Sequence, residues 1–167
     1  MAPVAVLVGA PGAGKSTIGA LLGERLGVPF ADSDTLIEAK AGKTVPEIFF
    51  DDGEPAFREL EKDTIAEALV TFDGVLSLGG GSILDPDTRT ALAGHPVVLL
   101  AVSFPVAIKR VGLGAGRPLL SINPRATLRH LMDERLPLYR EVAAYTVNTD
   151  DREPEDIADE IAALVKG

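Results

Sequence analysis

The sequence predicts an α/β protein in which helices cover both faces of a five-stranded parallel β-sheet. Two observations carry this prediction. Short apolar runs alternate along the whole chain with segments whose apolar residues recur every three or four positions, as strands and amphipathic helices do. The first run, residues 4–8, is apolar throughout, which is typical of a strand buried on both faces. A chain of 167 residues fits one such domain.

The other elements are expected in alternating order. After the first strand we expect a helix that begins near Lys15 and repeats its apolar residues over 18–26, a strand at 28–31, helices at 46–50 and 54–72, and a strand at 74–78. Then follow a helix at 87–93, a strand at 97–102, helices at 105–111 and 124–143, a strand at 145–149 and a helix at 154–166. Pro137 should end or kink the helix at 124–143, whose apolar face should include Leu128, Leu131, Met132 and Leu136.

Composition excludes several classes of function. The net charge of −9 argues against nucleic acid, which is bound through accumulated lysine and arginine. The chain contains no cysteine, which excludes disulfides, thiolate metal sites and thiol nucleophiles. It has neither a run of about 20 apolar residues nor a signal-peptide pattern, so we expect a soluble, cytoplasmic protein without a membrane partner. No exposed apolar helix face demands a partner chain, so we expect a monomer.

The first strand leads into a phosphate-binding loop, Gly9-Ala10-Pro11-Gly12-Ala13-Gly14-Lys15-Ser16-Thr17, called the phosphate loop below. Its glycines can adopt the positive φ angles that turn successive backbone N–H groups toward a polyphosphate. The N-terminus of the following helix adds further donors. Lys15 can reach the β- and γ-phosphates, and the Ser16 hydroxyl suits a magnesium ion that bridges them. We therefore expect the protein to bind ATP or GTP.

Two carboxylates follow the second strand, Asp32 and Asp34. They point the same way if the segment is extended, and would then suit a magnesium or substrate role at the ligand-binding edge of the sheet. If a helix begins here, one of them caps it and the other enters its first turn. Both readings remain open at this point.

The helix predicted at 54–72 carries apolar residues at helical spacing, with Arg58, Glu59, Glu61, Lys62 and Asp63 on its polar side. Arg58 by itself is consistent with an ordinary solvated charge. The third strand leads into Gly79-Gly80-Gly81, called the triple glycine below. Three glycines at a strand end favour close approach of the backbone to another group, although a plain flexible turn has the same composition.

A glycine-rich segment, residues 112–116, precedes Arg117. This composition suits a mobile lid that excludes water from bound phosphates and brings a positive charge to them. A surface loop with an unengaged arginine would have the same composition.

Together these features resemble shikimate kinase, within the nucleoside monophosphate kinase-like group of P-loop proteins. The resemblance covers essentially the full chain. Its motifs are residues 14–17, Asp32 with Asp34, Phe57-Arg58, the triple glycine, Arg117-Pro118-Leu119-Leu120, and Arg135 followed by Pro137-Leu138-Tyr139. It implies the strand order 2-3-1-4-5 and a single kinase domain over residues 1–167, with a substrate-binding region at about 32–73 and a lid at about 110–120.

The resemblance also implies roles for individual residues. Transfer of the ATP γ-phosphoryl group to the 3-hydroxyl of shikimate would use Lys15, Asp34 and Arg117 as catalytic residues. Shikimate would be bound by Asp34, Arg58, Gly79, Gly80, Gly81 and Arg135. The nucleotide would be bound by Gly12, Ala13, Gly14, Lys15, Ser16, Thr17, Arg110, Arg117 and Pro154. Magnesium would lie near Ser16 and Asp32, the aspartate acting through water. The family usually has threonine at the position of Ser33.

Three alternatives remain: a gluconate kinase, a nucleoside monophosphate kinase, or a module that binds ATP without transferring phosphate. The two arginines and the triple glycine favour an acceptor that is both an acid and a polyol, because guanidinium groups bind carboxylates in a planar, two-pronged geometry. A non-catalytic module would not need Asp34, Arg58, Arg117 and Arg135 together.

Overall fold

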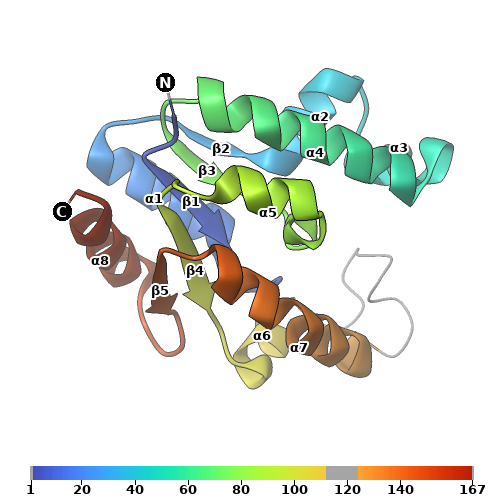
Figure 1. Ribbon diagram of the computed structural model, residues 1–167. Helices are drawn as coiled ribbons and strands as arrows, with labels where there is room; N and C mark the ends of the chain where they lie inside the picture. Colours follow the sequence, from blue (N-terminus) through green and yellow to red (C-terminus); the bar gives the residue numbers. More distant parts are fainter. Residues whose placement is uncertain (1, 112–123, 167) are drawn as a thin grey trace.

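The computed structural model describes residues 2–111 and 124–166, which form a five-stranded parallel sheet with helices on both faces (Figure 1). The strands are β1 (Ala5–Val8), β2 (Phe30–Asp32), β3 (Val75–Ser77), β4 (Val97–Ala101) and β5 (Tyr145–Asn148). Every neighbouring pair is parallel, and the order is β2-β3-β1-β4-β5. The predicted architecture and strand order are therefore confirmed.

The α-helices of the described residues are α1 (Lys15–Leu26), α2 (Ser33–Ala41), α3 (Val45–Asp52), α4 (Glu54–Thr71), α5 (Pro86–Leu92), α6 (Phe104–Val111), α7 (Pro124–Val142) and α8 (Pro154–Lys166). A short 3-10 helix that the sequence pattern does not predict, η1 (Ser82–Leu84), follows the triple glycine. The first helix begins at Lys15, as expected, so Lys15 and Ser16 lie in its first turn.

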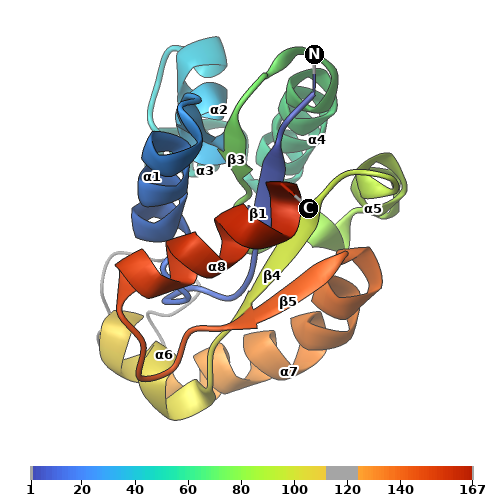
Figure 2. The ribbon, with the colours of Figure 1, turned by 90° about the vertical axis from the view of Figure 1, so that its left-hand side faces the viewer.

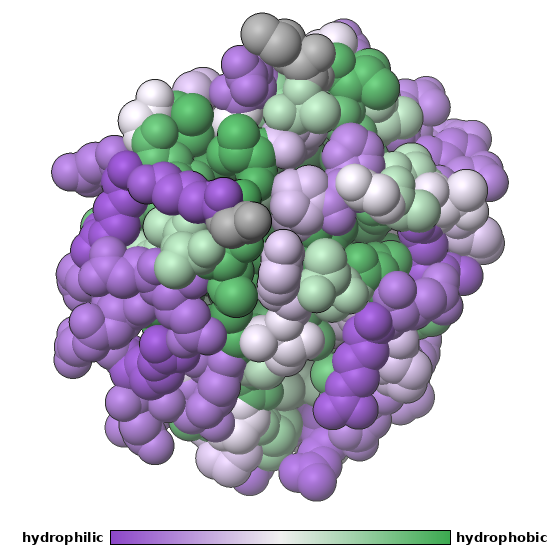
Figure 3. All heavy atoms as spheres, turned by 60° about the vertical axis from the view of Figure 1, so that its left-hand side comes forward, coloured by the Kyte–Doolittle hydropathy of each residue, from purple (hydrophilic) through white to green (hydrophobic). Residues whose placement is uncertain are grey.

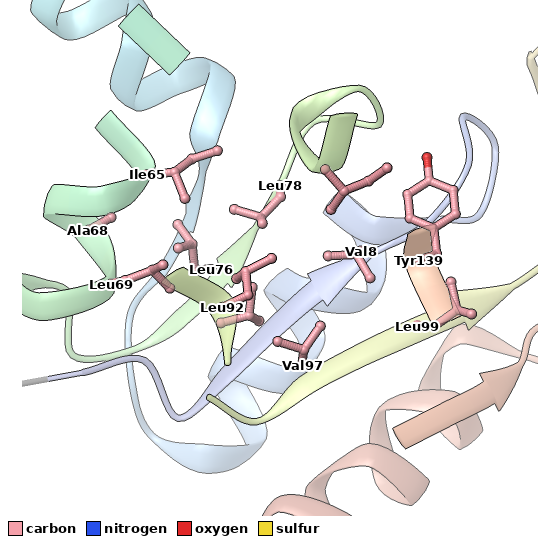
Figure 4. Packing of buried hydrophobic residues seen from close by; sticks show 12 residues of the cluster. Val8, Ile65, Ala68, Leu69, Leu76, Leu78, Leu92, Val97, Leu99 and Tyr139 are labelled. Atoms are coloured by element: carbon pink, nitrogen blue, oxygen red, sulfur yellow. The ribbon is translucent and has the colours of Figure 1, made fainter. Parts of the chain in front are cut away.

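The sheet has a hydrophobic core on each face because alternate residues of a strand point to opposite sides. On one face, Val6, Val8, Leu76 and Leu99 pack with residues of α4, α5 and α7, among them Ile65, Leu69, Leu92 and Tyr139 (Figure 4). On the other face, Ala5, Leu7, Val98 and Leu100 pack against α1 and α8. Figure 2 shows α8 crossing in front of the sheet, with α4 and α5 behind it. The sheet is thus covered on both sides.

Beyond the sheet, α2, α3 and α4 form a cluster of their own around Ile37, Ile48 and Phe57. Phe49 stacks on Phe57 with ring centroids 4.7 Å apart. A capping box at Thr44, in which Thr44 and Glu47 exchange hydrogen bonds, starts α3. These contacts hold α4, and with it Arg58, beside the carboxyl end of β3.

The prediction for α7 was wrong in one respect. Leu136, expected on its apolar face, is exposed, whereas Arg135 is buried. The buried residues of this helix are Leu128, Arg135 and Tyr139, which lie seven and four residues apart. Leu128 packs against Ala107 and Ile108 of α6, and Tyr139 packs in the core of the sheet. The helix also does not end at Pro137 but continues through it to Val142.

A second correction concerns α4. Glu61 was expected on the polar side of this helix, yet only 3% of its surface is exposed. The buried face of α4 includes Phe57, Glu61, Thr64, Ile65 and Ala68. Glu61 lies near the middle of the helix, where its carboxylate faces Gly79 in the loop after β3 and is paired with Arg58.

On the face of the molecule in Figure 3, hydrophobic residues show through the middle, and hydrophilic residues cover both flanks. Phe50, Val70, Leu84 and Leu136 are the large exposed hydrophobic residues of the described chain. No helix in residues 2–111 or 124–166 has the length and apolar character that crossing a lipid bilayer requires.

Candidate active site

The candidate site lies at the carboxyl ends of β1, β2 and β3, which are neighbours in the sheet. The phosphate loop follows β1, Asp32 is the last residue of β2, and the triple glycine follows β3. Because parallel strands end at the same edge, these three segments lie side by side, where open α/β sheets bind their ligands. Most of the predicted site residues belong to them or to α4 and α7 behind them.

The phosphate loop has the conformation that its glycines predict. Gly9, Gly12 and Gly14 all have positive φ angles, of 154°, 84° and 90°. A side chain at Gly9 would lie 2.8 Å from the Leu100 carbonyl oxygen, so the close packing of the loop on β4 also requires glycine there. The Lys15 ammonium donates hydrogen bonds to the Gly9 and Ala10 carbonyls at 2.8 and 3.2 Å. This holds the lysine over the loop, at the N-terminus of α1.

Asp32 joins the phosphate loop to β2. The Ser16 hydroxyl donates to its carboxylate at 3.1 Å, and the same carboxylate accepts the Asp34 N–H at 3.0 Å as the N-cap of α2. The segment is therefore helical from Ser33 onward, and the capping alternative is the correct one for the backbone. Capping still leaves Asp32 beside Ser16, where a carboxylate and a hydroxyl suit a magnesium ion.

No three His, Cys, Asp or Glu residues of the described chain lie close enough together to hold a metal by themselves. A magnesium ion near Ser16 and Asp32 would therefore depend on water and phosphate oxygens for its other ligands, which is usual for magnesium at nucleotide sites. The donor set fits that ion.

Each residue of the triple glycine faces a different charged group. A β-carbon at Gly79 would lie 3.3 Å from both the Asp34 and the Glu61 carboxylate oxygens. At Gly80 it would lie 3.5 Å from an Arg135 nitrogen, and at Gly81 only 2.7 Å from an Arg58 nitrogen. A side chain would be too close at Gly81 and tight at Gly79, whereas 3.5 Å at Gly80 is an ordinary contact, so close approach explains two of the three glycines. The loop passes close to four charged side chains.

Arg58 is held in place by two carboxylates of its own helix. Its guanidinium donates to Glu61 at 2.9 Å and to Glu54 at 3.4 Å, and it lies 5.3 Å from the ring centre of Phe57. A quarter of the Arg58 side chain is exposed, so it is not an ordinary solvated charge. One face of the guanidinium is against Gly81.

Glu61 was not predicted as a site residue, although its spacing of three from Arg58 is the signal that indicates their pairing. Burial raises its pKa above the ordinary value of 4.5, while attraction and hydrogen bonding from Arg58 oppose this increase. Asp34 also raises the Glu61 pKa, and Arg135 lowers it. Glu61 therefore interacts with all three predicted substrate-binding charges.

Arg135 is buried, with 5% of its surface exposed. Within the described residues its Nε atom has no hydrogen-bond partner. A buried cation with an unused donor is costly unless a ligand or water completes its hydrogen bonds. Arg135 thus lies beside Gly80, and Arg58 lies beside Gly81. The two guanidinium groups provide two positive charges for an anionic ligand.

The remaining nucleotide residues lie on the other side of the phosphate loop. Arg110 of α6 donates to the Gly12 carbonyl at 3.0 Å and to the Thr149 carbonyl at 3.2 Å. It therefore joins the phosphate loop to the turn between β5 and α8, whose first residue is Pro154. Arg117 and most of the predicted lid lie outside the described residues.

Comparison with known proteins agrees with this arrangement. A family model described as shikimate kinase matches residues 11–166. The chain is 58% identical over 165 residues to a shikimate kinase of Salinispora arenicola, covering 99% of both chains. It is 56% identical over 160 residues to a shikimate kinase of Thermobifida fusca, covering 96% of this chain and 93% of the relative.

Solved structures give the same result. Shikimate kinase from Acinetobacter baumannii in complex with shikimate superimposes with a TM-score of 0.92 at 40% identity, covering 99% of this chain and 93% of that one. A gluconokinase from Sinorhizobium meliloti has a TM-score of 0.63 at 21% identity, covering 97% of this chain and 90% of that one, and shares the fold alone.

Proposed function

Because the chain belongs to the shikimate kinase family, we propose that it transfers the γ-phosphoryl group of ATP to the 3-hydroxyl of shikimate. The products are shikimate 3-phosphate and ADP. This reaction belongs to the pathway that leads through chorismate to the aromatic amino acids. Family membership supports ATP as the phosphoryl donor, and the A. baumannii structure, which contains shikimate, supports the acceptor.

The observation that carries the proposal is the group of charges around the triple glycine. Arg58 and Arg135 lie against Gly81 and Gly80, and the Asp34 carboxylate lies beside Gly79. Shikimate carries one carboxylate and three hydroxyls on a compact ring. Two guanidinium groups suit its carboxylate, because an arginine can make two parallel hydrogen bonds to one carboxylate. The Asp34 carboxylate suits its hydroxyls.

The phosphate loop lies next to this group, because the Asp32 carboxylate accepts hydrogen bonds from Ser16 of the loop and from the Asp34 N–H. We propose that Lys15 exchanges its contacts with the Gly9 and Ala10 carbonyls for the β- and γ-phosphates when ATP binds. Asp34 orients the attacking hydroxyl and accepts its proton as the bond from phosphorus to the ADP oxygen breaks and the bond to shikimate forms. Catalysis then depends mainly on positioning and on neutralising charge.

The remaining assignments belong to the same proposal. Ser16 and Asp32 would hold magnesium, which offsets charge on the β- and γ-phosphates. Arg110 and the segment at Pro154 would flank the adenine, and Arg117 would assist phosphoryl transfer. The division into a substrate-binding region and a lid, the monomeric state and the cytoplasmic location stay predictions from the sequence.

The test is ADP release by the purified protein with ATP and magnesium, in separate reactions with shikimate, gluconate or a nucleoside monophosphate. We expect release with shikimate alone, and a phosphorylated shikimate detected by mass spectrometry. An Arg58→Ala variant should lose most of this activity while it still binds ATP, because Arg58 contacts the acceptor side only.

Other outcomes would redirect the proposal in a defined way. If gluconate or a nucleotide is phosphorylated instead, the phosphate-loop assignment stands and the roles of Asp34, Arg58 and Arg135 are wrong. If ATP binds and none of the three acceptors is phosphorylated, the protein acts as a nucleotide-binding module.

A further inference from the structure

The triple glycine is held by hydroxyl groups from three parts of the fold. The Gly79 N–H donates to the Ser33 hydroxyl of α2 at 3.0 Å. The Gly79 carbonyl accepts the Ser82 hydroxyl of η1 at 2.8 Å. The Gly80 carbonyl accepts the Tyr139 hydroxyl of α7 at 2.6 Å. Glycine is the most flexible residue type, so these bonds determine which way the peptide groups of the loop point.

Two backbone N–H donors of the triple glycine, those of Gly80 and Gly81, remain for a ligand. In the part of the chain that the structure describes, no residue accepts a hydrogen bond from the Gly80 or Gly81 N–H. Both N–H groups belong to residues that lie against Arg135 and Arg58. The orientation of the Gly80 and Gly81 peptides therefore decides whether these donors and the two guanidinium groups can bind one ligand together.

Tyr139 is well placed to set that orientation. Its ring belongs to the hydrophobic core and packs with Val8 and Leu99, and its hydroxyl points away from the other labelled side chains of the cluster (Figure 4). Burial raises the pKa of Tyr139 to about 12, so its hydroxyl stays protonated and can donate at every pH at which the enzyme would work. The Tyr139 ring is thus fixed by the core, and its hydroxyl presents one hydrogen-bond donor to the triple glycine.

The same hydroxyl also interacts with Arg135. A hydrogen bond from Arg135 and its positive charge both lower the Tyr139 pKa, against the effect of burial. The two residues are one helical turn apart on α7. A β-carbon at Gly80 would lie 3.5 Å from both the Tyr139 oxygen and an Arg135 nitrogen, so both side chains end beside Gly80.

We propose that Tyr139 is a positioning residue for the acceptor site: its hydroxyl orients the Gly80 peptide and the Arg135 guanidinium together, so that both meet shikimate as one rigid unit. The inference rests on the proposed function for the identity of the ligand. It assigns to Tyr139 no contact with substrate and no part in phosphoryl transfer. Ser33 acts on the Gly79 end of the same loop.

The test is Tyr139→Phe, which removes the hydroxyl and keeps the ring in the core. We expect the dissociation constant for shikimate, measured by titration calorimetry, to rise about tenfold, the effect of losing one good hydrogen bond. The dissociation constant for ATP should stay within twofold of the wild-type value. Tyr145→Phe is the matched control, because Tyr145 begins β5 at the opposite edge of the sheet, and it should change neither constant.

The proposal is overturned if Tyr139→Phe leaves shikimate binding unchanged, or if it weakens shikimate and ATP equally, which would indicate a role in the fold alone. Failure of the proposed function gives a different result, namely a wild-type protein that neither binds nor phosphorylates shikimate. In that case hydrogen–deuterium exchange of the backbone over residues 78–84 decides. Exchange that is faster in Tyr139→Phe than in Tyr145→Phe supports positioning of the loop, and equal exchange refutes it.

Discussion

Replacing Gly81 with alanine should move the Arg58 guanidinium without disturbing the backbone. Gly81 has φ −96° and ψ 0°, a conformation that alanine can adopt. Its new β-carbon would lie 2.7 and 2.8 Å from the two terminal nitrogens of Arg58, where ordinary contact begins at 3.4 Å. The guanidinium must therefore shift by about 0.7 Å, on the scale at which misplacement of a binding group impairs catalysis.

The expected loss follows from the bond that Arg58 would make to the shikimate carboxylate. A hydrogen bond between two charged groups contributes about 1.5–3 kcal/mol, so its loss should raise KM for shikimate about 10- to 100-fold. KM for ATP should stay within about twofold, because Arg58 lies on the acceptor side of the site. The free energy of unfolding should change by less than about 1 kcal/mol, since a glycine-to-alanine change at an allowed φ is not destabilising.

Steady-state ADP release, with shikimate and ATP varied in turn, measures both KM values. The control is the same substitution in an Arg58→Ala background. If Gly81→Ala acts by displacing Arg58, it should have little further effect there, and the double-mutant cycle will be strongly non-additive. Additive losses, or an equal rise in both KM values, would refute the steric explanation.

Three further results are expected. Lys15→Ala should lower turnover about 10²- to 10³-fold with an unchanged melting temperature, and near-normal ADP release would rule out the phosphate-loop mechanism. Asp32→Asn keeps an N-cap for α2 but removes a charge, so the magnesium concentration for half-maximal activity should rise about tenfold in a magnesium titration. Because folding raises the Glu61 pKa, the stability that Glu61 contributes is full below pH 4.5 and is lost as the pH rises through its folded pKa. Glu61→Gln lacks this dependence, so denaturant unfolding should show the variant gaining stability relative to wild type between pH 4 and 7; a constant difference would contradict the assignment.

The parts of the site that the sequence predicted are those whose chemistry is local. In the phosphate loop, the strand, the glycines and Lys15 all lie within a few residues of one another, and each glycine has the φ angle that its position indicates. The alternation of strands and helices is likewise a local pattern. The pairing of Arg58 with Glu61 could also have been predicted from local spacing, because the two residues are three positions apart on one helix.

The sequence by itself determined the fold class, the phosphate loop and, through the family motifs, the order of the strands. Only the tertiary structure decided which polar residues are buried. Periodicity placed Glu61 with the solvated residues and Leu136 with the buried ones, and both placements were wrong. The hydroxyls that hold the triple glycine, from Ser33 and Tyr139, are 46 and 59 positions away from the residues they bind. A helical pattern reports the average apolarity of a face, whereas burial of a charge or hydroxyl depends on the partner that distant parts of the chain bring to it.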